Sequence, residues 1–105
     1  MIRHIVAVRF KESFSKEENE VNAQKVKALL EALKSVIPGI IEFTVHINLC
    51  SSSNMDIVFD SIFESEKALN DYQVHPEHVR VADYVRTVMT DRICVDYPIS
   101  ELTND

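Results

Sequence analysis

The chemistry that this sequence could perform is concentrated in one short polar segment. Residues 71–78 read Asp-Tyr-Gln-Val-His-Pro-Glu-His and hold two of the four histidines of the chain. His75 and His78 are three residues apart across a predicted helix start, so both rings can project toward one point. A neutral imidazole beside the Tyr72 phenol is a proton-transfer pair near pH 7. The segment is therefore the first candidate for a functional site.

Two residues outside this segment can complete a pocket. His4 lies in the middle of the apolar face of the first predicted strand, where a lone imidazole is expensive to bury without a partner. Asp96, on the last predicted strand, can point toward the same side. We hypothesise a pocket that contains His4, Tyr72 and His78, with Asp96 orienting His78 as a carboxylate orients a catalytic imidazole.

Each of these side chains also has a purely structural interpretation. His75 directly precedes Pro76, and capping of the next helix by its ring is the interpretation we favour. His4 is then a satisfied core histidine, and His78 is hydrogen-bonded to a backbone carbonyl. Tyr72 is then a core aromatic residue whose hydroxyl reaches a partner. Spacing alone does not choose between these interpretations and the pocket.

A metal site and reactive thiols are not expected. His75 and His78 together with His4 would supply three imidazoles, but no recognisable zinc pattern completes them. Cys50 and Cys94 lack CxxC or metal spacing, so we expect reduced thiols that act as small buried hydrophobic residues. We predict no metal and no cofactor.

Hydrophobic periodicity predicts the elements that must position these residues. Alternation favours strands over 2–10, 41–49, 55–63 and 92–97, and places His46 on an exposed polar face. Helical spacing follows a capping box at Ser15 and runs to Val36, before the turn signal Pro38-Gly39. Ser65 can cap a short helix through about residue 72, and an apolar stripe at helical spacing continues from Pro76 to Met89.

The order β-α-β-β-α-β, with the second helical segment split, indicates an α+β ferredoxin-like protomer. Its helices cover one face of an antiparallel sheet. The other face is bare but carries apolar residues, which are Ile5 and Ala7 on the first strand and Val58 and Ile62 on the third. An apolar face exposed to water is expected to pack against another protein surface. We therefore predict a homodimer through the sheet faces, a closed dimeric α+β barrel.

Composition limits the classes of function. The 105 residues make one domain, with an ordered core over about 2–98 and a polar C-terminal tail. Lys and Arg number 11 against 17 Asp and Glu, a net charge of −6 without a basic stripe. We therefore expect neither nucleic-acid nor membrane binding. One glycine excludes a glycine-rich phosphate loop. Because no apolar run could span a bilayer or serve as a signal peptide, we expect a cytoplasmic protein.

Five groups of residues, spread from residue 4 to 97, resemble one known family. They are His4-Ile5-Val6 with Arg9-Phe10-Lys11, Ile37-Pro38-Gly39-Ile40, Phe63, Tyr72 with His75-Pro76-Glu77-His78-Val79, and Asp96-Tyr97. The chain thereby resembles the stress-responsive α/β-barrel (Dabb) family of dimeric α+β barrels. The resemblance implies a ferredoxin-like protomer that dimerises through its sheets, in agreement with the reading of the elements above.

The family resemblance leaves the activity open. Many members have no assigned activity, whereas a plant branch contains a polyketide cyclase that closes its chain by an aldol-type condensation without a cofactor. Its catalytic tyrosine and histidine fall on Tyr72 and His78, and its other pocket groups on His4 and Asp96. A further pocket histidine of that cyclase is replaced here by Ile57.

Three hypotheses follow from the residues and the resemblance. The first is a stress-type protein that holds a small hydrophobic or carbonyl-containing molecule in an apolar pocket. The second is a cofactor-free cyclase or lyase, in which His78 takes a proton beside a carbonyl and Tyr72 binds the enolate. The third is a structural dimer without an open pocket. A related family of monooxygenases uses Asn and Trp in this pocket, and this chain has no Trp.

Overall fold

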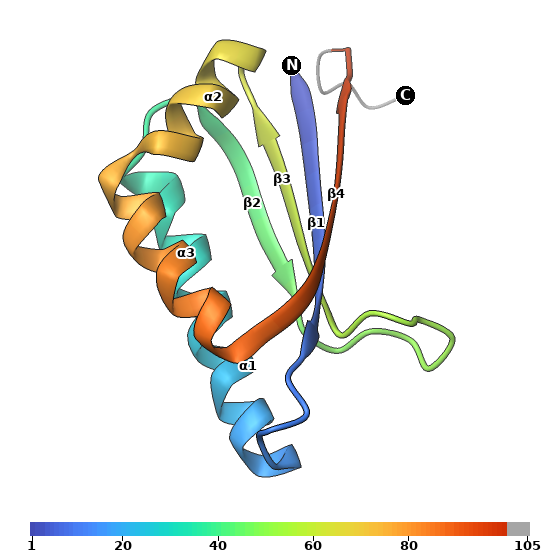
Figure 1. Cartoon of the computed structure of the whole chain (residues 1–105). Helices are drawn as coiled ribbons and strands as arrows, with labels where there is room; N and C mark the ends of the chain where they lie inside the picture. The colour runs from blue at the N-terminus through green and yellow to red at the C-terminus, as the bar shows by residue number, and fades with distance from the viewer. Residues whose placement is uncertain (101–105) are drawn as a thin grey trace.

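Four strands and three α-helices make up the computed structural model, which describes residues 1–100 of the chain (Figure 1). The elements in chain order are β1 (Ile2–Phe10), α1 (Lys16–Glu31), the 3-10 helix η1 (Ala32–Ser35), β2 (Ile40–His46), β3 (Ile57–Phe63), α2 (Glu66–Val74), α3 (Pro76–Val88) and β4 (Met89–Pro98). The tail predicted beyond the core lies, from residue 101 on, outside the described residues.

The strands form one antiparallel sheet in the order β2-β3-β1-β4. All three helices lie on one face of this sheet, and β4 begins beside the end of α3 and bends across to pair with β1 (Figure 1). This arrangement confirms the ferredoxin-like α+β class and the split of the second helical segment into α2 and α3.

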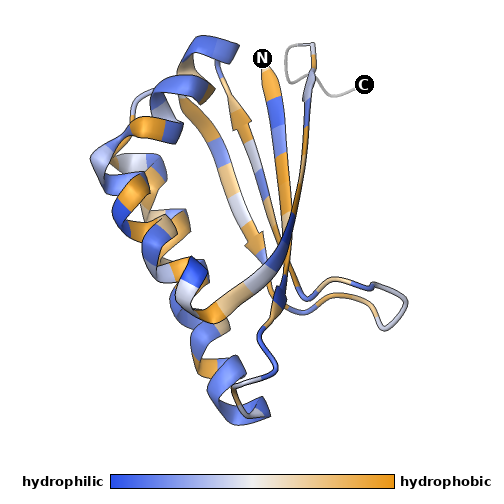
Figure 2. Cartoon of the chain, in the orientation of Figure 1, coloured by the Kyte–Doolittle hydropathy of each residue, from blue (hydrophilic) through white to orange (hydrophobic). Residues whose placement is uncertain are grey.

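The hydrophobic core lies between the sheet and the helices. Hydrophobic and polar residues alternate along β2 (Figure 2), as expected for a strand with one buried face, whereas β1 and β3 each contain runs of consecutive hydrophobic residues. Val26 of α1, Ile57 and Phe63 of β3 and Val81 of α3 are almost fully inaccessible to solvent. The inward face of β1 also carries His4, which is therefore buried among apolar groups.

Local capping explains where the first helix begins and ends. The Ser15 hydroxyl accepts a hydrogen bond from the Glu18 N–H, and the Glu18 carboxylate accepts one from the Ser15 N–H, which confirms the capping box. The helix predicted to reach Val36 changes after Glu31 into the 3-10 helix η1. Gly39, in the following turn, adopts a φ of +90°.

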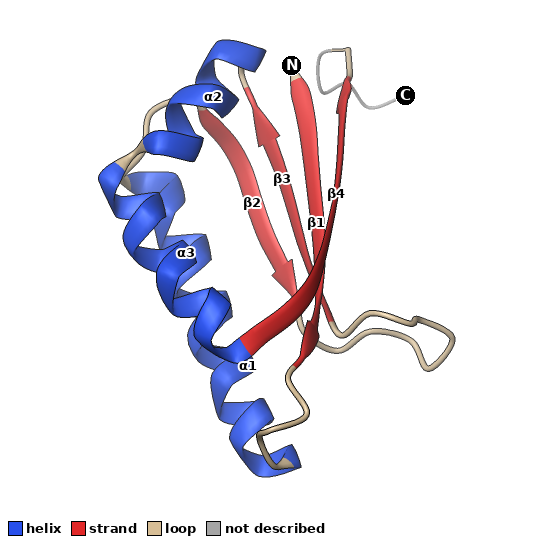
Figure 3. Cartoon of the chain, viewed as in Figure 1, coloured by secondary structure: helices blue, strands red, loops and turns tan. Residues whose placement is uncertain are grey.

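Strands β2 and β3 are shorter than predicted, and a ten-residue loop, 47–56, joins them (Figure 3). In this loop the Ser53 hydroxyl bonds to both backbone polar groups of Met55, a local arrangement that competes with strand pairing. The Asp56 carboxylate accepts a hydrogen bond from the Phe10 N–H, 2.8 Å away. These local bonds occupy the residues just before β3, which starts at Ile57 and not at Met55.

The outer face of the sheet carries the apolar residues that the sequence placed there. Ala7 pairs with Val58, and Ile62 lies opposite Arg3, which puts them together with Ile5 on the side away from the helices. Ala7 and Ile62 are buried within the protomer, so they are less available to a partner than predicted. A further row on β4 of the same face is exposed, and consists of Ile93, Val95 and Tyr97.

Among the described residues, no helix is both long enough and apolar enough to cross a membrane.

Candidate functional site

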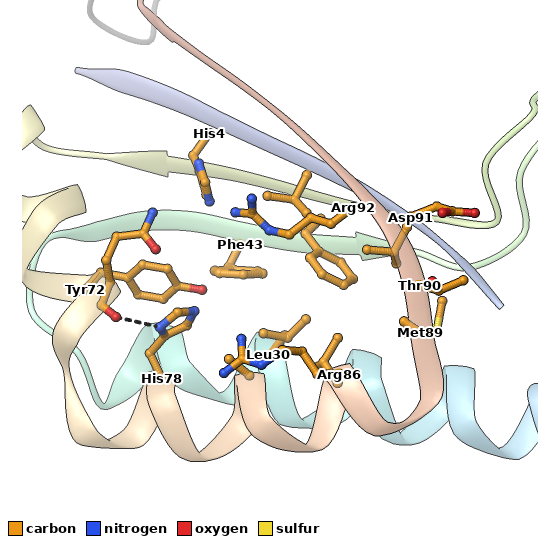
Figure 4. A pocket seen from close by; sticks show the side chains of 16 residues that line it. His4, Leu30, Phe43, Tyr72, His78, Arg86, Met89, Thr90, Asp91 and Arg92 are labelled. Carbon is orange, nitrogen blue, oxygen red and sulfur yellow. Dashed lines mark hydrogen bonds between the residues drawn. The ribbon is translucent and has the colours of Figure 1, made fainter. Parts of the chain in front are cut away.

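A cavity of about 490 Å³ lies between the sheet and the helices. Its volume falls in the range of about 300–1,000 Å³ that is typical of small-molecule sites. Apolar side chains form most of its wall, namely Val6, Val8, Leu30, Phe43, Phe59, Ala82, Val85 and Met89. His4, Tyr72 and His78 meet at one end (Figure 4), so the structure brings together three of the four predicted site residues.

His78 lies in the first turn of α3, and its ring is held by the end of α2. Its Nδ1 donates a hydrogen bond to the Gln73 carbonyl, 3.2 Å away (dashed line in Figure 4). Because a carbonyl can only accept, Nδ1 carries the proton and Nε2 keeps its lone pair. Burial lowers the pKa of His78, and the charges of His4, Arg86 and Arg92 lower it further against the effect of the Gln73 bond. The ring is therefore a neutral base.

Tyr72 projects from α2 and is buried against the same ring. The Tyr72 and His78 ring centroids are 4.1 Å apart, and Phe63 packs against the other side of the phenol. Burial raises the pKa of the Tyr72 hydroxyl, although the charge of Arg92 opposes this shift. The hydroxyl therefore keeps its proton. It makes no hydrogen bond to any residue between 1 and 100, which corrects the expectation that it reaches a protein partner.

Asp96 binds His4 and not His78, which is a correction of the predicted arrangement. His4 and Asp96 are direct neighbours in the β1–β4 ladder, and His4 Nδ1 donates a hydrogen bond to the Asp96 carboxylate. Side chains opposite each other in a ladder lie on one face within reach. His78 comes instead from α3, across the cavity. His4 is thus both a satisfied core histidine, 4% exposed, and a cavity-lining residue.

The other two histidines take structural or exposed positions. His75 is the N-cap of α3, and its ring Nδ1 accepts a hydrogen bond from the Glu77 N–H at 3.1 Å, as the favoured interpretation predicted. The ring is thereby held at the helix end, and does not join His4 and His78 in a set of three imidazoles. His46 is exposed at the end of β2, as predicted.

Both cysteines are exposed, so the prediction of buried cysteines was wrong. Cys50 lies in the loop after β2, and Cys94 lies on the edge strand β4, whose residues after Met89 are hardly covered by the helices. The Cys94 sulfur, His4 Nδ1 and an Asp96 oxygen all lie within 4.8 Å of one another. These donor types suit zinc. A metal ion there would have to replace the hydrogen bond between His4 and Asp96.

Sequence reasoning missed Arg92, which lines the cavity beside the three predicted residues. Ala7 pairs with Ile93 but Arg9 with Thr90, so β4 contains one extra residue, a β-bulge, at Asp91 and Arg92. Asp91 has a φ of +55°, which is uncommon for a residue other than glycine. The bulge lets Met89 and Arg92 line the same cavity, which simple alternation would not allow. Asp is one of the residues that tolerate a positive φ, but nothing else in the sequence predicts a bulge at this position.

Several solved structures have a similar fold. A dimeric protein of unknown function with a ferredoxin-like fold from Bacteroides fragilis has a TM-score of 0.86 and 28% identity, over 93% of this chain and 95% of that one. A Dabb family protein from Mesorhizobium loti has a TM-score of 0.71 and 25% identity, over 94% and 97%. A hydroxynitrile lyase from Passiflora edulis has a TM-score of 0.77 and 19% identity, over 97% and 95%, and this likeness concerns the fold alone.

A ferredoxin-like α+β protomer with a polar-ended cavity between its sheet and its helices is thus the class that the geometry defines. The model of the family described as stress responsive A/B barrel domain matches residues 2–99. The chain belongs to this family, which confirms the resemblance drawn from the sequence. No curated protein matches the chain.

Proposed function

We propose that the protein is a homodimer whose protomers each bind a small, largely apolar carbonyl compound. The observation that carries this proposal is the composition of the cavity. Its wall is mostly apolar, and its polar end presents a protonated Tyr72 hydroxyl and the free Nε2 of His78. A hydroxyl that has no acceptor in the described part of the chain can donate to a ligand carbonyl, and the apolar side chains of the wall can contact the remainder of the ligand.

The dimer part of the proposal is supported by the outer face of the sheet. Ile93 and Val95 are each 54% exposed there, and Val95 lies directly opposite Ile5 in the ladder. The similar protein from Bacteroides fragilis is dimeric. Sedimentation equilibrium at micromolar concentration should give twice the 12.0 kDa chain mass. A monomer mass under these conditions would exclude this part of the proposal.

A cofactor-free lyase or cyclase is the second candidate, and the contact between Tyr72 and His78 favours it. In the first step His78 Nε2 takes a proton from the carbon beside the ligand carbonyl. The electrons of that C–H bond move into the carbonyl to form an enolate, which accepts a hydrogen bond from Tyr72. In the second, the enolate carbon forms a bond to another carbonyl, whose oxygen takes up a proton. Ile57, at the position of the further cyclase histidine, is fully buried in the core.

Binding and proton transfer can be tested with one probe, the 1,3-diketone benzoylacetone, whose central carbon is acidic. Calorimetry should detect binding to the wild-type protein, and Tyr72→Phe should weaken it about three- to tenfold, since one neutral hydrogen bond is lost. Tyr84→Phe is the matched control, because Tyr84 is a partly buried tyrosine that does not line the cavity. Absence of binding to the wild-type protein, or equal effects of the two substitutions, would contradict the proposal.

The second candidate has its own readout, the exchange of the central protons of benzoylacetone with deuterated solvent. His78→Gln should reduce catalysed exchange by about 10²- to 10⁴-fold if His78 is the general base. His46→Gln, which changes an exposed histidine away from the cavity, should leave it unchanged. Binding without catalysed exchange would leave the protein as a binding protein and rule out the lyase.

A further inference from the structure

Arg92 is a cation in the cavity wall without an acidic partner among residues 1–100. The other charged groups of the wall are already engaged, since Arg86 pairs with Asp83 at 2.7 Å and Asp91 with Arg9 at 3.7 Å. Within residues 1–100, no carboxylate oxygen lies within 4.0 Å of the Arg92 guanidinium. Figure 4 shows this side chain extending along the cavity toward His4.

The charge of Arg92 acts on the polar end of the cavity. It opposes the rise in the pKa of Tyr72 and adds to the fall in the pKa of His78, although neither residue is its neighbour in the chain. A guanidinium group presents its N–H donors in a planar fork that matches the two oxygens of a carboxylate. The carboxylate of a bound ligand could pair with Arg92, which has no acidic partner in the described part of the protein.

The backbone at this position supports a specific role for the side chain. The β-bulge and the positive φ of Asp91 place Arg92 on the cavity side, and Met89 on the same side belongs to the hydrophobic core. Irregular backbone of this kind has an energetic cost, and it is found preferentially where it directs a side chain into a site.

We propose that Arg92 binds the carboxylate of the natural ligand, which is therefore an apolar carboxylic acid. This inference rests on the proposed function and narrows its ligand class. A single guanidinium group balances one negative charge, and apolar side chains form most of the remaining wall. The protein as a whole carries a net charge of −6, which disfavours the approach of polyanions such as nucleotides. A monoanion with a hydrophobic body fits both conditions.

The test compares 4-phenylbutyrate with its neutral amide, 4-phenylbutanamide, by calorimetry at pH 7. The wild-type protein should bind the acid at least about tenfold more tightly than the amide, because a charge-assisted hydrogen bond replaces a neutral one. Arg92→Gln should abolish this preference while affinity for the amide stays unchanged. Arg92→Lys should keep part of the preference, since it retains the charge but not the planar fork.

Arg80→Gln is the matched control, because Arg80 is an exposed arginine of α3 that pairs with Glu77 and does not line the cavity. It should keep the full preference for the acid. Equal binding of acid and amide, or a preference that survives Arg92→Gln, would overturn this inference and leave the proposed function standing. If neither compound binds the wild-type protein, this inference is overturned, and the benzoylacetone experiment decides the proposed function separately.

Discussion

The two imidazoles of the cavity are held through the same ring atom, Nδ1, by different acceptors. His4 donates from Nδ1 to the Asp96 carboxylate, and His78 donates from Nδ1 to the Gln73 carbonyl. Each bond fixes the ring orientation, and at His78 it leaves Nε2 as the atom that carries the lone pair. The carboxylate accompanies the more deeply buried ring, where an unsatisfied polar group would be most costly. His78, with only a neutral acceptor, is the better candidate for the base.

The lowered pKa of His78 predicts how stability depends on pH. An unfolded histidine has a pKa of about 6.5, and burial puts the folded value below it. Between these two values the unfolded chain binds a proton that the folded chain does not. The contribution of His78 to the free energy of unfolding is therefore fully present above about pH 6.5 and decreases as the pH falls through this window.

An NMR titration of the His78 ring proton, assigned by its loss in His78→Gln, should give a midpoint below 6.5. The same substitution should reduce the pH dependence of urea unfolding within the window. A midpoint at or above 6.5 would mean that the ring is solvated or paired with an acid, and His78 would lose its place as a preformed neutral base.

At the scale of elements, the junction of α2 and α3 explains how a short motif places two functional groups. The His75 N–H donates to the Tyr72 carbonyl at the end of α2, and the His75 ring accepts from the Glu77 N–H at the start of α3. Pro76 occupies the first turn, where its missing N–H has no cost. His75 thus fixes the positions of Tyr72 and His78 relative to each other without contacting the ligand itself.

Elements governed by local rules could be predicted from the sequence. The capping box at Ser15, the split at His75 and the alternation of β1 each depend on residues near one another in the chain. The partner of Asp96 and the orientation of Arg92 depend on how β4 pairs with β1, about ninety residues away, and on one extra residue in β4. Periodicity describes a single strand and contains no information about a bulge in a pair of strands.

The turn before β2 provides a test of element packing. Gly39 has a φ of +90°, and a Cβ built on it would lie 2.7 Å from the Cβ of Ala68 in α2. Gly39→Ala should therefore destabilise the protein by about 2 kcal/mol or more, from backbone strain together with the steric overlap. Chemical denaturation with an unchanged m-value would measure this change.

Combining Gly39→Ala with Ala68→Gly separates the backbone strain at residue 39 from the steric overlap with Ala68. It removes the overlap but not the strain, so the double variant should lose less stability than the sum of the two single changes. Strict additivity of the two substitutions would show that Ala68 does not constrain the turn.

At the scale of the whole molecule, β4 connects the cavity to the proposed interface. Its inward residues Arg92 and Asp96 belong to the cavity and to the His4 pair, whereas Ile93 and Val95 point to the bare face. As the edge strand of the sheet, β4 is paired on one side only, with β1. A partner sheet packed on the bare face would therefore support the strand that carries Arg92.

Val95→Asp should separate the protomers, because a carboxylate in the centre of the proposed interface would be buried without a cation. Sedimentation at micromolar concentration should then give a monomer of about the chain mass, 12.0 kDa. Val21→Asp is the control, since Val21 is 69% exposed on α1, away from the sheet face, and this variant should remain dimeric. Because β4 would lose its support, Val95→Asp should also weaken the binding of 4-phenylbutyrate, although no cavity residue has changed. A dimer that survives Val95→Asp would place the interface elsewhere, and unchanged binding by a proven monomer would show that each cavity works independently of the partner.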